Sequence, residues 1–298
     1  MLSQMYALAT YKAEGDETPR IGVFHGDRIY PLVGSPGGEG AMLSVIAAWE
    51  AWQPLVEAAV GSGGIPLERV RLLAPLQYPG KILAAGSNYP AHAREMRPEA
   101  PSALLKAPYF FLKPTRHCVI GPEEPVILPD WTDAIDWEVE LAVVIGKTAR
   151  RVAPEEAFDY VFGYTILNDV TSRTATRRPQ DRFPVDWFSG KGLESFCPMG
   201  PWVVPKQFVP EPPALRLTLR VNGEVRQEGN SAEMLFDIPT LIAYASQRIP
   251  LDPGDVLSTG TPSGVGAGQN RFLQPGDVME AEIEGIGRLR NPVVAFQG

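Results

Sequence analysis

The chain has 298 residues, a formal net charge of −8 and a hydrophobic fraction of 44%. This length allows one large domain or a large domain with a small one, and the composition supports a substantial core. We find no apolar run long enough to cross a bilayer. No basic face of the kind that binds nucleic acid stands out, and the short Arg177-Arg178 pair indicates a solvated surface. The N-terminal residues lack the basic and apolar regions of a signal peptide, so we expect a cytoplasmic protein that binds neither membrane nor nucleic acid.

The N-terminal segment predicts a small β-rich domain. Residues 6–11 and 20–32 are apolar, β-branched runs bounded by turn residues. Residues 43–60 repeat their apolar side chains at helical spacing, and we expect a helix here that kinks at Pro54. The predicted domain spans residues 1–71.

The remainder, residues 72–298, predicts a larger domain. Residues 72–81 hold two prolines and a glycine and are typical of a linker. Many short apolar runs follow, separated by Pro and Gly turns, with few long helical patterns. This favours an α+β domain dominated by strands over a parallel βαβ sheet. The cysteines Cys118 and Cys197 lack the spacing of a zinc site, and we interpret Cys197 as a small buried residue.

Three familiar motifs are incomplete in this chain. Residues 145–148 resemble the end of a phosphate-binding loop, but Leu141 stands where that motif needs a glycine. Residues 261–265 resemble the turn that carries a nucleophilic serine but lack both flanking glycines. The glycines nearby do not have dinucleotide-binding spacing. The sequence therefore argues against a kinase, a serine hydrolase and a dehydrogenase.

Two acids in an apolar strand give the first chemical signal. Residues 136–146 are rich in β-branched side chains, and alternation along a strand places Glu138 and Glu140 on one face. Ala142 and Val144 continue that face, so we expect it to be covered. Two covered like charges raise one another's pKa unless a cation lies between them. The alternative is a solvated strand end with two ordinary acids.

A third acid favours the metal interpretation. Asp169 follows an apolar run that leads into a polar turn. Together with Glu138 and Glu140 it would complete an all-oxygen site suited to Mg²⁺ or Mn²⁺, and Ca²⁺ is compatible with the same donors. No Cys or His ligand pattern supports zinc.

A histidine and a glutamate are predicted to share one face of a short helix. If Pro90 opens a helix, His92 and Glu95 are i, i+3 neighbours. A carboxylate beside an imidazole orients the ring and raises its basicity, as a general base requires. The alternative is a surface pair with no chemical role.

Two lysines and a glycine-rich loop are candidates for binding an anion. Lys113 and Lys191 lie in apolar or glycine-rich settings, where they would either counter substrate charge or be solvated. Residues 259–266 offer backbone N–H groups and hydroxyls to an anion, or else form a plain hairpin turn.

Taken in order, these segments resemble the fumarylacetoacetate hydrolase family. The resemblance runs from about residue 72 to the C-terminus. It is carried by GSNYPAHAREM (86–96), FFLKP (110–114), DWEVELAVVIGK (136–147), GYTILNDVTSR (163–173), GKGLESFCPMGP (190–201) and LSTGTPSGVG (257–266). The resemblance implies a catalytic domain of mixed β-sandwich or roll type, a homodimer, and a small anionic substrate.

The resemblance also implies roles for individual residues. The ligands of Mg²⁺ would be Glu138, Glu140 and Asp169. The catalytic residues would be His92 and Glu95, on a lid, and Lys191. The substrate-binding residues would be Lys113, Arg173 and Thr261.

Three departures from the family pattern fall at the rim of the expected pocket. Residues 173–176 read Arg-Thr-Ala-Thr where the family often has Arg-Asp-x-Gln. Ser87 stands where an arginine is common, and residues 191–195 replace a Lys-Ser-Phe-Asp-Thr run. The reaction class is therefore better defined than the substrate.

The leading hypothesis is metal-dependent hydrolytic cleavage of a carbon–carbon bond in an acylpyruvate or a fumarylacetoacetate-like dioxo acid. Decarboxylation of oxaloacetate or an oxo-tricarboxylate, isomerisation of a 2-hydroxyhepta-2,4-diene-1,7-dioate-type dienol, and dehydration of a sugar acid would fit the same site. A non-catalytic keto-acid binder is the alternative of a different class. The His92–Glu95 pair argues against it, because binding alone needs no base.

Overall fold

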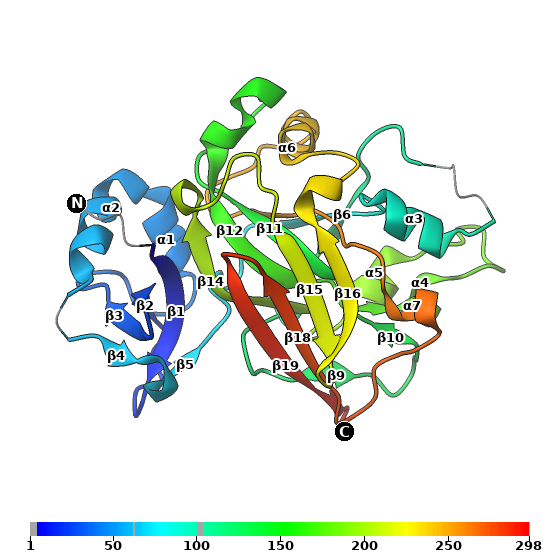
Figure 1. The fold of residues 1–298 in the computed structure, drawn as a ribbon, viewed down its shortest axis with the longest axis horizontal. Coiled ribbons are helices and arrows are strands. Elements are labelled where there is room, and N and C mark those ends of the chain that lie inside the picture. Colours follow the sequence, from blue (N-terminus) through cyan, green and yellow to red (C-terminus); the bar gives the residue numbers. More distant parts are fainter. Residues whose placement is uncertain (1–4, 62, 100–103, 298) are drawn as a thin grey trace.

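The computed structural model describes residues 5–61, 63–99 and 104–297. Three β-sheets organise this part of the chain (Figure 1). The twelve-stranded sheet contains β1 (Ala7–Ala13), β2 (Arg20–His25), β3 (Arg28–Pro31), β4 (Ile65–Pro66), β5 (Val70–Leu72), β6 (Ile82–Ala85), β7 (Phe110–Lys113), β8 (Val119–Ile120), β11 (Val139–Ile145), β12 (Val161–Asn168), β14 (Cys197–Pro205) and β17 (Val256–Ser258). The five-stranded sheet contains β9 (Val126–Leu128), β15 (Arg216–Val221), β16 (Glu224–Asn230), β18 (Val278–Ile283) and β19 (Gly287–Ala295). The third sheet is the pair β10 (Ile135–Asp136) and β13 (Thr171–Ser172).

Helices within the described residues are short. The α-helices are α1 (Ala41–Ala47), α2 (Trp49–Ala59), α3 (Pro90–Met96), α4 (Arg173–Thr176), α5 (Trp187–Lys191), α6 (Ile238–Ser246) and α7 (Gly266–Gln269). The 3₁₀ helices are η1 (Leu67–Arg69), η2 (Pro154–Tyr160), η3 (Lys206–Phe208) and η4 (Ser231–Glu233).

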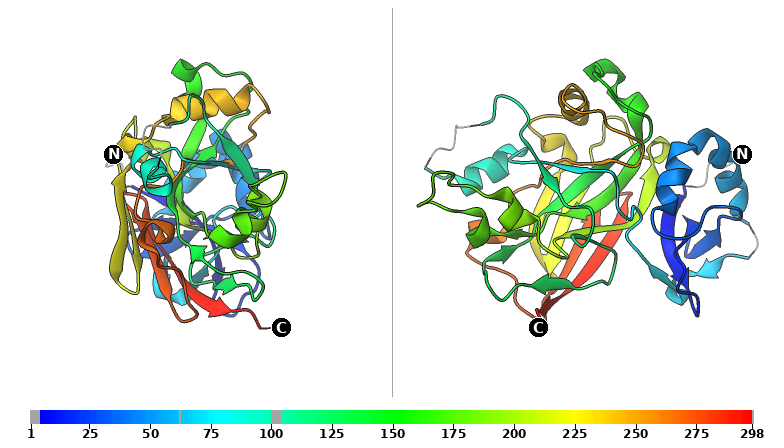
Figure 2. Two further views of the ribbon diagram at one scale, coloured as in Figure 1. Left: turned by 90° about the vertical axis from the view of Figure 1, so that its right-hand side faces the viewer. Right: turned by 180° about the vertical axis from the view of Figure 1, so that it is seen from behind.

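The core lies between the two large sheets. Strands β11, β12 and β14 lie side by side, and this part of the sheet contacts β15, β18 and β19 of the smaller sheet. The two layers are seen edge-on in Figure 2. Every residue of β11 and β12 is buried, which suits their β-branched and aromatic side chains. The predicted α+β architecture dominated by strands is confirmed.

The N-terminal segment forms its own group of strands and helices, at the left of Figure 1. It is joined to the rest by hydrogen bonding between β1 and β14, where Leu8 pairs with Val203. The larger sheet therefore runs through both parts of the chain. The division into domains at residue 71 stays a prediction, and so does the homodimer.

The single helix expected at residues 43–60 is two helices in the structure. The break falls at Ala48, whose φ of −112° and ψ of 35° separate α1 from α2. Pro54 lies inside α2 and does not end it. The prediction of one helix over this segment was wrong, because the backbone conformation at Ala48 interrupts the helical hydrogen bonding, whereas the kink at Pro54 stays a prediction.

The strand expected at residues 136–146 is interrupted at residues 137–138. Residues Ile135–Asp136 pair with Thr171–Ser172, and only from Val139 does the chain join the large sheet. The short link contains Glu138, which lies beside the end of β12 because Asp169 N donates to Glu138 O (2.9 Å).

Across the described ranges, no helix combines the length and apolar character that a membrane span requires.

Close contact between β12 and β14 gives a test of this core. A Cβ atom on Gly163 would lie 2.2 Å from the carbonyl oxygen of Val204. Gly163→Ala should therefore lower the free energy of unfolding by about 1–3 kcal/mol, since the backbone of β14 has to move. Gly61→Ala is the matched control, because nothing lies within 4 Å of its added Cβ. Equal urea midpoints for both variants would contradict this packing.

Candidate active site

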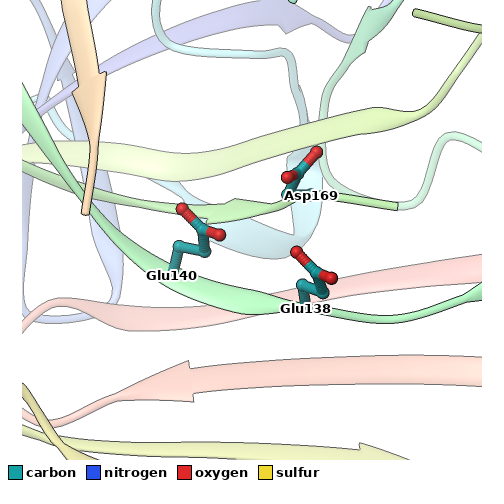
Figure 3. A group of neighbouring side chains, drawn as sticks. All are labelled: Glu138, Glu140 and Asp169. Atoms are coloured by element: carbon teal, nitrogen blue, oxygen red, sulfur yellow. The ribbon is translucent and has the colours of Figure 1, made fainter. Parts of the chain in front are cut away.

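Three buried carboxylates converge between the ends of two neighbouring strands. Glu138 precedes β11, Glu140 lies within it, and Asp169 follows β12. One oxygen from each lies within 4.8 Å of the others, and all three side chains are buried. Figure 3 shows the three groups pointing toward one another. The prediction that Glu138 and Glu140 share a covered face is confirmed.

Two lysines partly offset this negative charge. Lys191, at the end of α5, donates to Glu138 (2.8 Å) and also to Asp169. Lys113, at the end of β7, donates to Asp169 (2.5 Å) and to the carbonyl of Lys191 (2.7 Å). Burial lowers the pKa of Lys113, but the charge of Asp169 outweighs burial and holds the pKa above its usual range, so Lys113 stays an ammonium.

Arg173 adds a third cation on the opposite side of Glu138. Its Nη2 lies 2.7 Å from Glu138 Oε1, and its Nε donates to Asp136 (2.7 Å). Asp136 also accepts hydrogen bonds from the backbone N–H groups of Gly266 (2.5 Å) and Ala267 (3.0 Å). Asp136 therefore fixes both Arg173 and the start of α7.

The carboxylates differ in how well they are compensated. Burial raises the pKa of Glu138, but the charges of Lys191 and Arg173 outweigh it and hold that pKa well below its usual range. Burial and the charges of Asp169 and Glu138 raise the pKa of Glu140, whose partners are the Ser258 hydroxyl (2.5 Å) and a backbone N–H. Within the described residues, Glu140 forms no ion pair.

These residues fit a divalent cation. The donor set is all oxygen, which suits Mg²⁺ or Mn²⁺. Glu140 is a buried acid whose charge is opposed by its neighbours, and a cation held by the three carboxylates would reverse that penalty.

The glycine-rich loop at residues 259–267 binds anions, but they are the protein's own carboxylates. Gly260 N donates to Glu140 (2.9 Å), and Gly264 N donates to both oxygens of Glu95 (3.0 and 3.1 Å). The two N–H groups that hold Asp136 belong to the same loop. The loop thus ties a metal-site acid to the predicted lid helix.

Helix α3 begins at Pro90 and brings His92 and Glu95 together, as predicted. His92 Nδ1 lies 3.4 Å from Glu95 Oε2, at the outer limit of a hydrogen bond. The helix is anchored just before it starts: Asn88 donates to the carbonyls of Thr259 (2.9 Å) and Phe236 (3.0 Å). Because Nδ1 faces Glu95, Nε2 is the nitrogen left for a ligand.

A cavity of about 190 Å³ joins these groups. Its lining is Ala85, Gly86, Ser87, His92, Met96, Arg97, Phe111, Glu138, Glu140, Asp169, Arg173, Thr176, Arg177, Val185, Trp187, Lys191 and Thr261. Phe111 and Trp187 stack with centroids 5.0 Å apart and form an apolar wall. A flat, conjugated, anionic molecule of a few carbons suits this combination.

Two predicted substrate-binding residues have other partners. Lys113 is buried behind Asp169 and does not line the cavity, so its contacts favour a role in balancing the charge of the carboxylates. Thr261 lines the cavity, but its hydroxyl donates to Val139 O (2.9 Å) and accepts from Gln227 (2.8 Å).

Sequence reasoning missed several supporting residues. Asp136 stands within a recognised motif, and its place next to Glu138 was a signal that could have been used. Gln227 holds Val139 N (3.0 Å) from another sheet, and no local pattern marks it.

Comparisons with known proteins agree with this geometry. The chain matches the family described as fumarylacetoacetate (FAA) hydrolase C-terminal over residues 81–294. It is 36% identical over 294 residues to oxaloacetate tautomerase fahd2, mitochondrial, of Xenopus laevis, covering 96% of this chain and 90% of that protein. Maleylpyruvate hydrolase from Sphingobium sp. SYK-6, solved in complex with manganese(II) ion and pyruvate, is 34% identical with a TM-score of 0.81, covering 98% of this chain and 100% of that one. 5-carboxymethyl-2-hydroxymuconate delta-isomerase from Mycobacterium smegmatis is 32% identical with a TM-score of 0.75, covering 97% and 100%.

The strand-rich fold and its acidic cavity define an enzyme that acts on oxo acids. The chain belongs to the fumarylacetoacetate hydrolase family.

Glu140→Gln tests the metal site without an activity assay. In the metal-free fold the raised pKa of Glu140 costs stability at pH 7, because the unfolded chain ionises this acid more easily. The variant should therefore unfold a few degrees higher without metal, as about 1 kcal/mol corresponds to roughly 2–4 °C. This gain should shrink toward pH 4, where the acid is protonated in both states.

Added Mn²⁺ should raise the unfolding midpoint of the wild type and leave that of Glu140→Gln unchanged. The exposed acid Glu228 provides a control, since Glu228→Gln should alter neither the midpoint nor its response to Mn²⁺. A variant that still gains stability from Mn²⁺ would remove Glu140 from the ligand set.

Proposed function

We propose that this protein is a metal-dependent enzyme that interconverts the keto and enol forms of a small 2-oxo acid of the oxaloacetate type. The observation that carries the proposal is that His92 and the three carboxylates line one small cavity. The relative from Xenopus laevis, similar over almost the whole chain, supports oxaloacetate as the first substrate to test.

The residues present suffice for proton transfer next to a carbonyl. A divalent cation held by the three carboxylates would polarise the 2-oxo group, which lowers the cost of removing a proton from carbon 3. His92 Nε2 would take that proton, with Glu95 3.4 Å from Nδ1 to orient the ring. The C3–H electron pair becomes the C2–C3 double bond, the carbonyl oxygen takes a proton from water, and the protonated His92 returns its proton to the solvent.

Lys191 is suited to offset the charge that develops on the enolate oxygen. Its ammonium lines the cavity, donates to Glu138 (2.8 Å) and lies 5.1 Å from the centroid of Phe111. A fixed cation in a buried setting stabilises a transient anion more strongly than water does.

Hydrolytic cleavage of an acylpyruvate is the second candidate. It is favoured by the likeness to maleylpyruvate hydrolase, whose solved structure holds manganese(II) and pyruvate. Acylpyruvates and oxaloacetate share the pyruvyl end, so the inner end of the cavity, beside the three carboxylates, would bind both. Hydrolysis asks His92 to deprotonate a water molecule instead of a carbon.

A substrate panel separates the two reactions. Oxaloacetate, acylpyruvates and a hydroxymuconate-type dienol would be incubated with Mg²⁺ and with EDTA, while enol absorbance and released pyruvate are followed together. Tautomerisation predicts a Mg²⁺-dependent change in oxaloacetate absorbance without pyruvate release. Pyruvate released from acylpyruvates would move the assignment to hydrolase, and pyruvate from oxaloacetate alone would indicate decarboxylation.

His92→Gln tests the proposed base. It should slow exchange of the carbon-3 protons of oxaloacetate with deuterium by roughly a hundredfold or more, since general-base catalysis contributes about that much. Mn²⁺ affinity, measured by calorimetry, should remain that of the wild type, because His92 is not a proposed ligand. Unchanged exchange in this variant would assign proton transfer to another group.

A further inference from the structure

Two arginines at the mouth of the cavity lie outside the proposed proton-transfer machinery. Arg97 follows the last residue of α3, and Arg177 follows the last residue of α4. Both are exposed and both line the cavity that contains His92 and the carboxylates. Arg177 also lines an adjoining surface hollow, so it stands where that hollow meets the cavity.

Among the described residues, neither arginine forms an ion pair, whereas their neighbours do. Arg173 is engaged with Asp136 and Glu138, and Arg178 pairs with Asp186. Both residues of the short Arg177-Arg178 run are exposed, as expected, but their surroundings differ. Arg178 pairs with Asp186, whereas Arg177 lines the cavity.

The backbone of Arg177 is held in place although its side chain is exposed. Its N–H donates to Thr174 O (3.2 Å), and the residue forms a β-bridge with Val185, which lines the same cavity. Arg178 N donates to Pro184 O (2.9 Å) and continues this pairing. A fixed backbone limits the volume that the guanidinium can occupy and keeps it near the mouth.

Charge is distributed unevenly along the cavity. At its base, Lys191 and Arg173 are already matched to the carboxylates. At its mouth, Arg97 and Arg177 form no ion pair within the described residues. A guanidinium in this position is suited to a carboxylate, which it binds through two parallel hydrogen bonds.

We propose that Arg177, assisted by Arg97, binds the second carboxylate of a dicarboxylic 2-oxo acid and selects it over monocarboxylic ones. This inference rests on the proposed function, because the 2-oxo end of the substrate must bind beside the three carboxylates if the other end is to reach the mouth of the cavity. The cavity of about 190 Å³ limits the spacing between the two ends to a short chain. The two arginines are specificity-determining residues and take no part in proton transfer.

The test uses oxaloacetate and 2-oxobutyrate, in which a methyl group replaces the distal carboxylate. Deuterium exchange at carbon 3 is followed for both in the Mg²⁺-loaded enzyme. Arg177→Gln should lower kcat/KM for oxaloacetate by roughly 10- to 100-fold, mainly through KM, as expected for a lost charge-assisted hydrogen bond. The same substitution should leave kcat/KM for 2-oxobutyrate within about twofold of the wild-type value. Arg97→Gln should lower kcat/KM for oxaloacetate by a smaller factor and also leave that for 2-oxobutyrate unchanged.

Matched controls lie on the same two segments. Arg94 on α3 and Arg182 on the turn after α4 are exposed and do not line the cavity. Arg94→Gln and Arg182→Gln should leave kcat/KM unchanged for both substrates. An equal fall for both substrates in Arg177→Gln would indicate a structural role and overturn the proposal, and so would an unchanged preference for oxaloacetate.

Failure of the proposed function can be told apart from failure of this inference. If the wild type exchanges protons of neither substrate, calorimetry of the Mn²⁺-loaded protein with malate and with 2-hydroxybutyrate, which are not enolised, decides the point. If the wild type binds malate more tightly than 2-hydroxybutyrate and this difference disappears in Arg177→Gln, the result supports Arg177 as the group that binds the distal carboxylate. Equal affinity of the wild type for the two ligands overturns it.

Discussion

Mutual repulsion of three carboxylates is the constraint around which this molecule is arranged. Oxygens of Glu138, Glu140 and Asp169 lie within 4.8 Å of one another in a buried setting, where like charges interact strongly. Such a cluster survives only if other groups supply opposite charge. Lys113 and Lys191 supply it from two elements remote in sequence, but they pair with Glu138 and Asp169 and not with Glu140, whose pKa stays raised. The remaining deficit is what makes the site suited to a divalent cation.

Backbone N–H groups supply the rest of the support. The loop at residues 259–267 holds three acids with different tasks: Glu140 at the base, Glu95 on α3, and Asp136 behind Arg173. Because one loop holds all three, the position of α3 is coupled to that of Glu140. These backbone contacts hold the three side chains in fixed positions relative to the loop.

The sequence predicted the parts of the site that depend on local periodicity. Strand alternation predicted that Glu138 and Glu140 lie together, which they do although Glu138 precedes β11, and helical spacing placed His92 beside Glu95. The partners of these residues could not be predicted in the same way, because they arrive from other elements. Gln227 reaches Val139 from a different sheet, for example.

Misinterpretations have equally physical causes. The loop at 259–266 was expected to offer N–H groups to an anion, and the chemistry was right, but the anions are internal carboxylates that no spacing rule reveals. The Arg177-Arg178 pair was interpreted as solvated surface, and both residues are exposed, but the sequence does not show that their side chains have different surroundings. Only the tertiary structure separates a residue paired with Asp186 from one that lines the cavity.

The two ends of the cavity are joined by one close approach between α4 and α5. A Cβ atom on Gly190 would lie 1.7 Å from Thr176 Oγ1, so the helices can lie this near only with glycine at that position. Thr176 Oγ1 donates to Ser172 O (2.7 Å), and both Thr176 and the next residue, Arg177, line the cavity. Lys191 follows Gly190 directly and lies at the base. A side chain at 190 would therefore displace Lys191, at the inner end of the cavity, and Arg177, the arginine proposed to bind the distal carboxylate. The packing of α4 against α5 thus positions Lys191 and Arg177 relative to one another.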